Sequence, residues 1–90
     1  MHTRRVTLTN ATGLHVRPAT AFMDVANRFR SLISVARDDL IADGKSAISL
    51  MLLEAGRGTE IEIQATGDDE VEAVEALAGL IERQFTSVDR

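Results

Sequence analysis

Residues 13–20 read Gly-Leu-His-Val-Arg-Pro-Ala-Thr, and this stretch predicts a tight turn followed by the start of a helix. Gly13 permits a backbone turn that other residues resist. Pro18 fits the first turn of a helix, where its missing N–H costs nothing. An apolar stripe at helical spacing follows, over Ala19, Phe22, Met23, Ala26 and Phe29. The sequence therefore predicts an amphipathic helix over Val16–Phe29, with His15 at its N-terminal end.

His15 lies at the end of this helix where anions bind. The first backbone N–H groups of a helix have no partner inside it, and the helix dipole adds partial positive charge there. Phosphate groups bind at such ends, and Arg17 adds a forked, permanently charged set of donors. A neutral imidazole beside these donors is placed to receive a phosphoryl group as a nucleophile. Spacing alone leaves an alternative open, in which His15 is a polar first-turn residue and Arg17 a solvated cation.

Alternation of apolar and polar residues predicts four β-strands around this helix. Their predicted ranges are Thr3–Thr9, Leu32–Arg37, Leu40–Ala42 and Thr59–Thr66. The residues expected to face the core are Val6, Leu8, Ile33, Val35, Ile61, Ile63 and Ala65. The pair Asp38-Asp39 indicates a turn, so the second and third strands should form a hairpin.

Two further helices are predicted. Ser46 is a favoured N-cap residue and opens a short helix over Ala47–Leu53, in which Leu50 and Leu53 can face the core. The last helix starts at Asp69, where Glu72 three residues later resembles a capping box. Its buried stripe is expected at Val71, Val74, Leu77, Ala78 and Ile81, with Phe85 near the end.

The predicted elements follow the order β-α-β-β-α-β-α within a single domain over residues 1–90. Helices separate the first strand from the second and the third strand from the fourth. One sheet with the helices stacked on one face satisfies this order. The sequence therefore predicts an α+β fold.

Charge and composition exclude several classes of function. The net charge of −4 argues against nucleic acid as a partner. The chain has no Cys, which suits a reducing cytoplasm and excludes a Cys-based metal site. No apolar run approaches the length of a membrane span, and the N-terminus has no signal-peptide core. We therefore expect a cytoplasmic protein without membrane insertion. His2 has no second ligand nearby, so no metal site is predicted.

Residues 13–20 are similar to the active-site signature of the HPr family, the small histidine phosphocarriers of the bacterial phosphoenolpyruvate-dependent sugar phosphotransferase system. A second family stretch resembles residues 45–61, and the match runs without gaps from about Thr3 to the last helix. The resemblance implies an open-faced β-sandwich. In that fold, a four-stranded antiparallel sheet carries three helices on one face, and the fourth strand lies between the first and the second.

The resemblance also implies a function. His15 would accept a phosphoryl group on its Nδ1 atom from phosphorylated enzyme I and pass it to a histidine of a sugar-specific IIA component. Arg17 and the nearby backbone amides would stabilise the phosphoryl charge, with Thr12, Val16 and Pro18 in supporting positions. Such a protein is a carrier on which other enzymes act, not an enzyme itself, and it needs no cofactor.

Ser46 has two readings. As an N-cap residue, its hydroxyl would only hold the start of the helix. In many family members, a serine at this position is phosphorylated by HPr kinase/phosphorylase, which makes Ser46 a candidate regulatory site. The family members that carry this serine commonly have glycine where this chain has Ser49 and Glu54. These departures bear on recognition by the kinase and on how the second helix ends.

The resemblance maps a partner-binding patch onto Thr20, Ala47, Ile48 and Met51. Helical spacing allows Ile48 and Met51 to be exposed or buried, and the family match favours exposure. The family also implies a monomer. Two alternatives to sugar transport remain open from the sequence. One is a nitrogen-type paralogue that signals instead of feeding sugar uptake, and the other is a module that only binds a regulator.

Overall fold

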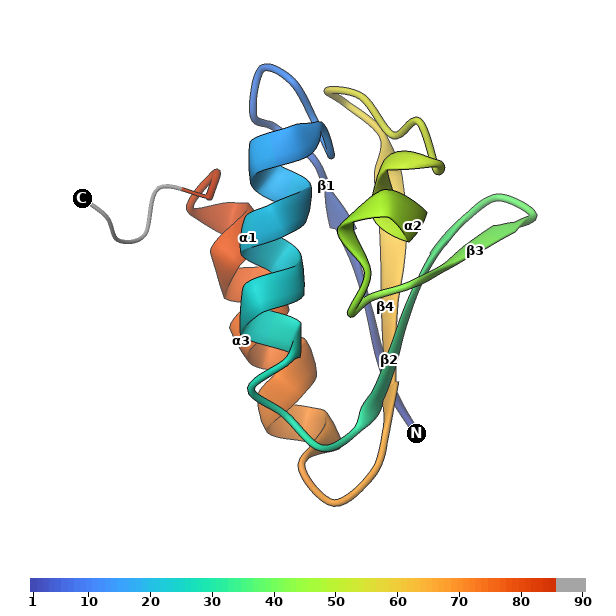
Figure 1. Cartoon of the computed structure of the whole chain (residues 1–90), viewed down its shortest axis with the longest axis vertical. Helices are drawn as coiled ribbons and strands as arrows, with labels where there is room; N and C mark the ends of the chain where they lie inside the picture. The colour runs from blue at the N-terminus through green and yellow to red at the C-terminus, as the bar shows by residue number, and fades with distance from the viewer. Residues whose placement is uncertain (86–90) are drawn as a thin grey trace.

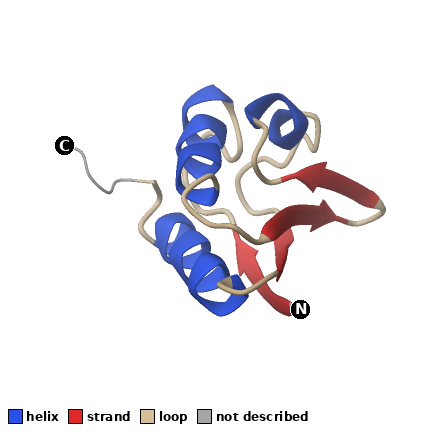
Figure 2. Ribbon diagram, turned by 60° about the horizontal axis from the view of Figure 1, so that its bottom comes forward, coloured by secondary structure: helices blue, strands red, loops and turns tan. Residues whose placement is uncertain are grey.

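The computed structural model describes residues 1–85, which fold into one antiparallel sheet with three helices on one side of it (Figures 1 and 2). The elements are β1 (His2–Thr7), α1 (Val16–Ala26), β2 (Leu32–Arg37), β3 (Leu40–Asp43), α2 (Ala47–Met51), β4 (Glu60–Thr66) and α3 (Glu70–Glu82). The strand order is β1-β4-β2-β3. The α+β fold is confirmed, and so is the position of the fourth strand between the first and the second.

The core lies between the helices and the covered face of the sheet. Every residue that the strand patterns assign to the core is buried, from Val6 in β1 to Ala65 in β4. Phe22 of α1 and Leu77 of α3 are fully buried against them. Each large apolar side chain removed from water in this way contributes about 1.5–3 kcal/mol. Within residues 1–85, no helix lies on the other face of the sheet (Figure 2).

Several element boundaries differ from the sequence prediction by one to three residues. β1 ends at Thr7, although Leu8 still donates its N–H to the Thr59 carbonyl at 2.9 Å. α1 ends at Ala26, because Phe29 donates to the carbonyl three residues before it and closes a tighter turn. α2 ends at Met51, two residues early.

The capping box predicted at the start of α3 is wrong. The Asp69 carboxylate accepts hydrogen bonds from the Ser31 hydroxyl at 2.6 Å, the Ser31 N–H at 3.0 Å and the Arg30 N–H at 2.9 Å. It makes no cap bond to its own helix. The burial predicted for Val71 is also wrong, since Val71 is 49% exposed. Ala73 and Leu80 are buried instead.

Candidate functional site

His15 is the N-cap residue of α1. Its backbone is extended, with φ −82° and ψ −169°, and its carbonyl accepts the Ala19 N–H at 2.8 Å. The ring makes no cap hydrogen bond, and the side chain is exposed. The N–H groups of Val16 and Arg17 precede the first intrahelical bond, so they are free to meet an anion. The geometry therefore places an accessible imidazole at the positive end of a helix.

The loop before His15 is held from two sides. Asn10 closes the turn, because its Nδ2 donates to the Gly13 carbonyl at 2.8 Å and its own carbonyl accepts the Gly13 N–H at 3.2 Å. Leu14 is buried and donates its N–H to the Ala55 carbonyl at 2.9 Å. Gly13 has φ +61°, and a Cβ there would overlap the Ala55 carbonyl oxygen and lie 2.6 Å from the Gly56 Cα. Only glycine fits this contact.

Two shallow hollows adjoin the helix end. His15 lines a hollow of about 370 Å³ together with Thr12, Leu14, Met51, Glu54, Ala55 and Gly56. Arg17 and Pro18 line a second hollow of about 400 Å³, between the loop and the end of α3. Thr12 borders both hollows, so it lies next to His15 as expected. Thr12 does not cap α1, because His15 holds that position.

Arg17 is exposed at the second position of α1. Within residues 1–85, its guanidinium has no hydrogen-bond or ion-pair partner. An unneutralised guanidinium two residues from an accessible imidazole favours the binding of a doubly charged anion such as a phosphoryl group.

Ser46 is the N-cap residue of α2, as the sequence predicts. Its hydroxyl oxygen accepts the Ser49 N–H at 3.2 Å, and its own N–H bonds the Asp43 carbonyl at 3.1 Å. The Ser49 hydroxyl accepts the Asp43 N–H at 2.9 Å, which ties α2 to the end of β3. Both serines therefore hold the start of α2, and Ser46 is half-buried.

The predicted partner patch is only partly on the surface. Ile48 is 70% exposed, and Thr20 is exposed with its hydroxyl donating to the Val16 carbonyl at 2.8 Å. Ala47 and Met51 are half-buried and pack against the core. Sequence reasoning missed Leu52, which is 73% exposed. The sequence could have indicated this exposure, because Leu52 lies four residues after Ile48 and residues four apart lie on the same face of a helix.

Glu54, one of the departures from the family pattern, has φ +52°. Arg37 donates to the neighbouring Leu53 carbonyl at 2.7 Å and so helps to close the end of α2. Glu54 occupies a backbone conformation that favours glycine, and it lines the His15 hollow.

The described part of the chain has neither a cluster of metal ligands nor a helix that could span a membrane. Residues 1–85 contain no group of three or more His, Asp or Glu side chains that could hold a metal ion. Over the same residues, no helix has the length and apolar character that crossing a membrane requires.

Comparisons with known proteins agree on one family. Residues 2–83 match the family described as PTS HPr component phosphorylation site. The chain is 40% identical over 86 residues to Phosphocarrier protein HPr of Pseudomonas putida, covering 94% of this chain and 96% of that protein. It is 36% identical over 83 residues to Phosphocarrier protein NPr of Proteus mirabilis, covering 91% and 92%.

A solved structure gives the same answer. The crystal structure of HPr from Thermoanaerobacter tengcongensis aligns with a TM-score of 0.93 and 38% identity, over 99% of this chain and 100% of that chain. The match to the family covers nearly every element described above, including the loop that carries His15. The chain therefore belongs to the HPr family of phosphocarrier proteins of the phosphotransferase system.

Proposed function

We propose that this protein accepts a phosphoryl group on Nδ1 of His15 from phosphorylated enzyme I and passes it to a histidine of a sugar-specific IIA component. The carrying observation is the exposed His15 ring at the N-terminal end of α1, with the unpaired guanidinium of Arg17 on the same turn. In each step, the bond from phosphorus to the donor breaks as the bond to the acceptor nitrogen forms. The transferred group therefore never becomes free phosphate.

The helix end suits a carrier because it stabilises the phosphoryl group only moderately. The Val16 and Arg17 amides and the Arg17 guanidinium spread the charge of the transferred oxygens. All of these donors face solvent, where their attraction is screened. The phosphorylated state is therefore stable enough to form and labile enough to transfer onward. Thr12 and Pro18 contribute by shaping the two hollows on either side.

The test is the intact mass after incubation with phosphoenolpyruvate and a trace of enzyme I. We expect the gain of one phosphoryl group that is lost on acid treatment, because the P–N bond of phosphohistidine is acid-labile. The His15→Ala variant should gain nothing and remain folded, since the side chain it loses is exposed. An acid-stable modification, or a full gain by His15→Ala, would overturn the proposal.

We further propose that Thr20, Ala47, Ile48, Met51 and Leu52 form the surface on which enzyme I and the IIA component dock, and that HPr kinase/phosphorylase acts on Ser46. Ser46→Asp should slow acceptance from enzyme I by about tenfold, because it adds negative charge beside this surface. Ser46→Ala is the matched control, since it removes the cap without adding charge. Equal rates for the Asp and Ala variants would count against regulation by charge.

The similarity to NPr supports a second candidate, a carrier for the nitrogen-type regulatory branch. Incubating the phosphorylated protein with a sugar-specific IIA component and with a nitrogen-type IIA component in separate reactions distinguishes the two. Faster transfer to the sugar-specific component supports the transport role. We also propose that the protein acts as a cytoplasmic monomer, although an HPr of T. tengcongensis forms a dimer in a crystal. Sedimentation of the purified protein tests this.

A further inference from the structure

The uncovered face of the sheet carries a trough along β2. The side chains of β2 on this face include Ser34 and Ala36, which are small. Their cross-strand neighbours are larger: Ser34 lies between Asp43 and Gln64, and Ala36 lies between Ile41 and Glu62. Small side chains on one strand between larger ones on both neighbours leave a depression along that strand.

One end of this trough is apolar. A hollow of about 570 Å³ is lined there by Met1, Leu32, Ser34, Ile41, Asp43, Lys45, Gln64 and Thr66, among others. Leu32 is 79% exposed and Ile41 is 71% exposed. Exposed large apolar side chains that gather around one hollow are typical of an interaction surface. Lys45 also lines this hollow, and its ammonium group donates a hydrogen bond to the Phe29 carbonyl at 2.8 Å.

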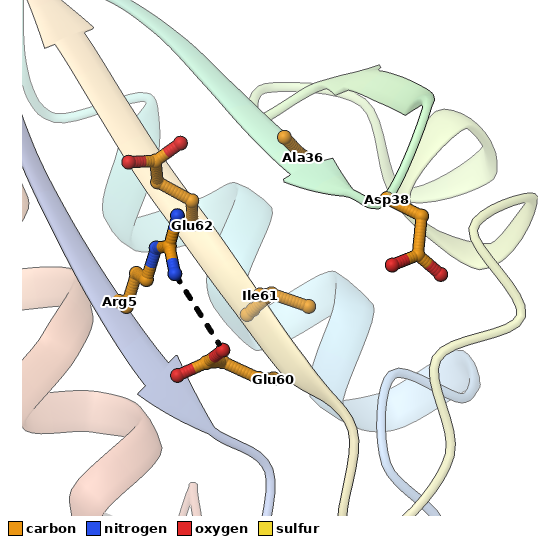
Figure 3. Close-up of a pocket in the computed structure, with 6 residues that line it drawn as sticks. All are labelled: Arg5, Ala36, Asp38, Glu60, Ile61 and Glu62. Carbon is orange, nitrogen blue, oxygen red and sulfur yellow. Dashed lines mark ion pairs between the residues drawn. The ribbon is translucent and has the colours of Figure 1, made fainter.

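The other end of the trough is acidic. A hollow of about 210 Å³ is lined by Arg5, Ala36, Asp38, Glu60, Ile61 and Glu62 (Figure 3). Figure 3 shows the Arg5 guanidinium between the carboxylates of Glu60 and Glu62, with Asp38 across the strand. The ion pair of Arg5 with Glu60 is long, at 4.0 Å, and both side chains are mostly exposed. Three carboxylates and one cation leave this end with a net charge of about −2.

We propose that the trough binds an extended segment of a partner protein that carries an apolar side chain at one end and Lys or Arg at the other. The apolar side chain enters the hollow at Leu32. Ile41 lines the same hollow from β3, opposite Ala36, and the cations meet Asp38, Glu60 and Glu62. From Leu32 to Asp38 the trough is about 20 Å long, the span of some six extended residues. Charge complementarity selects the occupant, since the acidic end repels nucleic acid and acidic peptides.

The probe is a capped hexapeptide, Leu-Thr-Val-Thr-Lys-Lys, supplied also with its sequence reversed, because either chain direction fits. The control peptide has the same sequence with Glu-Glu in place of Lys-Lys. We expect the basic peptide to shift the backbone amide resonances of residues 32–38, 41–43 and 60–66 in a ¹⁵N-labelled sample. We also expect it to bind at least about tenfold more tightly than the acidic peptide at low salt.

Three variants test the apolar and acidic parts of the trough. Ile41→Ser and Glu60→Lys should each weaken binding of the basic peptide by about fivefold or more, and Leu32→Ser should repeat the first effect. The matched controls are Val71→Ser and Glu72→Lys on α3, which make the same chemical changes at exposed positions on the helical side. The controls should bind within about twofold of the unmodified protein. Thermal unfolding of every variant reports whether the fold is retained.

Four outcomes would overturn the proposal. They are no amide shifts with the basic peptide, equal affinity for the two peptides, shifts centred on the His15 loop and α2, and equal weakening by the α3 controls. Sedimentation of the protein alone adds one more check. If it dimerises and Ile41→Ser abolishes the dimer, the occupant of the trough is a second copy of this chain and the partner segment is refuted.

Discussion

Glu54 combines two unfavourable properties at one residue. Its φ of +52° lies in the left-handed region, which disfavours any residue with a Cβ. Glu54 also lines the hollow that contains His15, where the proposed phosphoryl group would arrive. The two properties can be separated, because glycine removes both and glutamine removes only the charge.

We expect Glu54→Gly to raise the free energy of unfolding by about 0.5–1 kcal/mol and to speed phosphoryl acceptance by about two- to threefold. Glu54→Gln should give the same rate increase with stability nearly unchanged. Urea denaturation and single-turnover acceptance from enzyme I measure the two effects. If Glu54→Gln leaves the rate unchanged, the carboxylate does not act on the incoming phosphoryl group.

Gly13 is the residue on which the position of the His15 loop depends. Gly13→Ala should lower the free energy of unfolding by about 2–3 kcal/mol, because the added Cβ meets the Ala55 carbonyl and the backbone is left-handed. Gly56→Ala is a sharp control, since a Cβ there meets nothing within 4 Å. It should change stability by less than about 0.5–1 kcal/mol. Similar urea midpoints for the two variants would contradict the tight contact.

At the scale of elements, the start of α3 makes stability depend on pH. The Ser31 hydroxyl, and next the Arg30 N–H, lower the pKa of the Asp69 carboxyl below its usual 3.8. The ionised form therefore stabilises the fold. This stabilisation is fully present above the unfolded-state pKa and is lost as the pH falls through the lower pKa of the folded state.

Asp69→Asn should therefore be less stable than the unmodified protein at neutral pH, and the difference should shrink as the pH falls below about 3.8. Urea midpoints measured at a series of pH values test this. The pKa of Glu70 is also lowered, chiefly by the Gly67 N–H, but Glu70 is present in both proteins and its effect cancels. A difference that stays constant down to acid pH would show that Asp69 keeps its ordinary pKa.

The sequence predicts those features of the elements that neighbouring residues determine. It does not predict features that depend on contacts between residues far apart in the sequence. The alternation in β4 and the Ser46 cap are properties of neighbouring residues, and both predictions are confirmed. The Asp69 side chain is instead taken by Ser31, 38 residues earlier, which no local motif reveals. Likewise, Gly13 predicts a turn from the sequence, but the Ala55 carbonyl that leaves no room for a Cβ at Gly13 lies far along the chain.

At the scale of the whole molecule, stability resides on one side of the sheet. Ile63→Ala should lower the free energy of unfolding by about 2–5 kcal/mol, because Ile63 is fully buried under the helices. Ile41→Ala should change it by less than about 1 kcal/mol, because Ile41 lies on the uncovered face. Comparable losses for the two variants, measured by urea denaturation, would mean that the uncovered face is also protected from solvent.

Because the helices cover only one face of the sheet, two partners can bind on opposite faces at the same time. The helices lie on one side of the sheet (Figure 2), and His15 is the N-cap residue of α1 on that side. The trough lies on the other side of the sheet. A partner bound on the helical side and a segment bound in the trough do not overlap. A segment bound in the trough would leave the helical side accessible to one partner after another. The protein could then be anchored at one place in the cell while the proposed phosphoryl transfer continues.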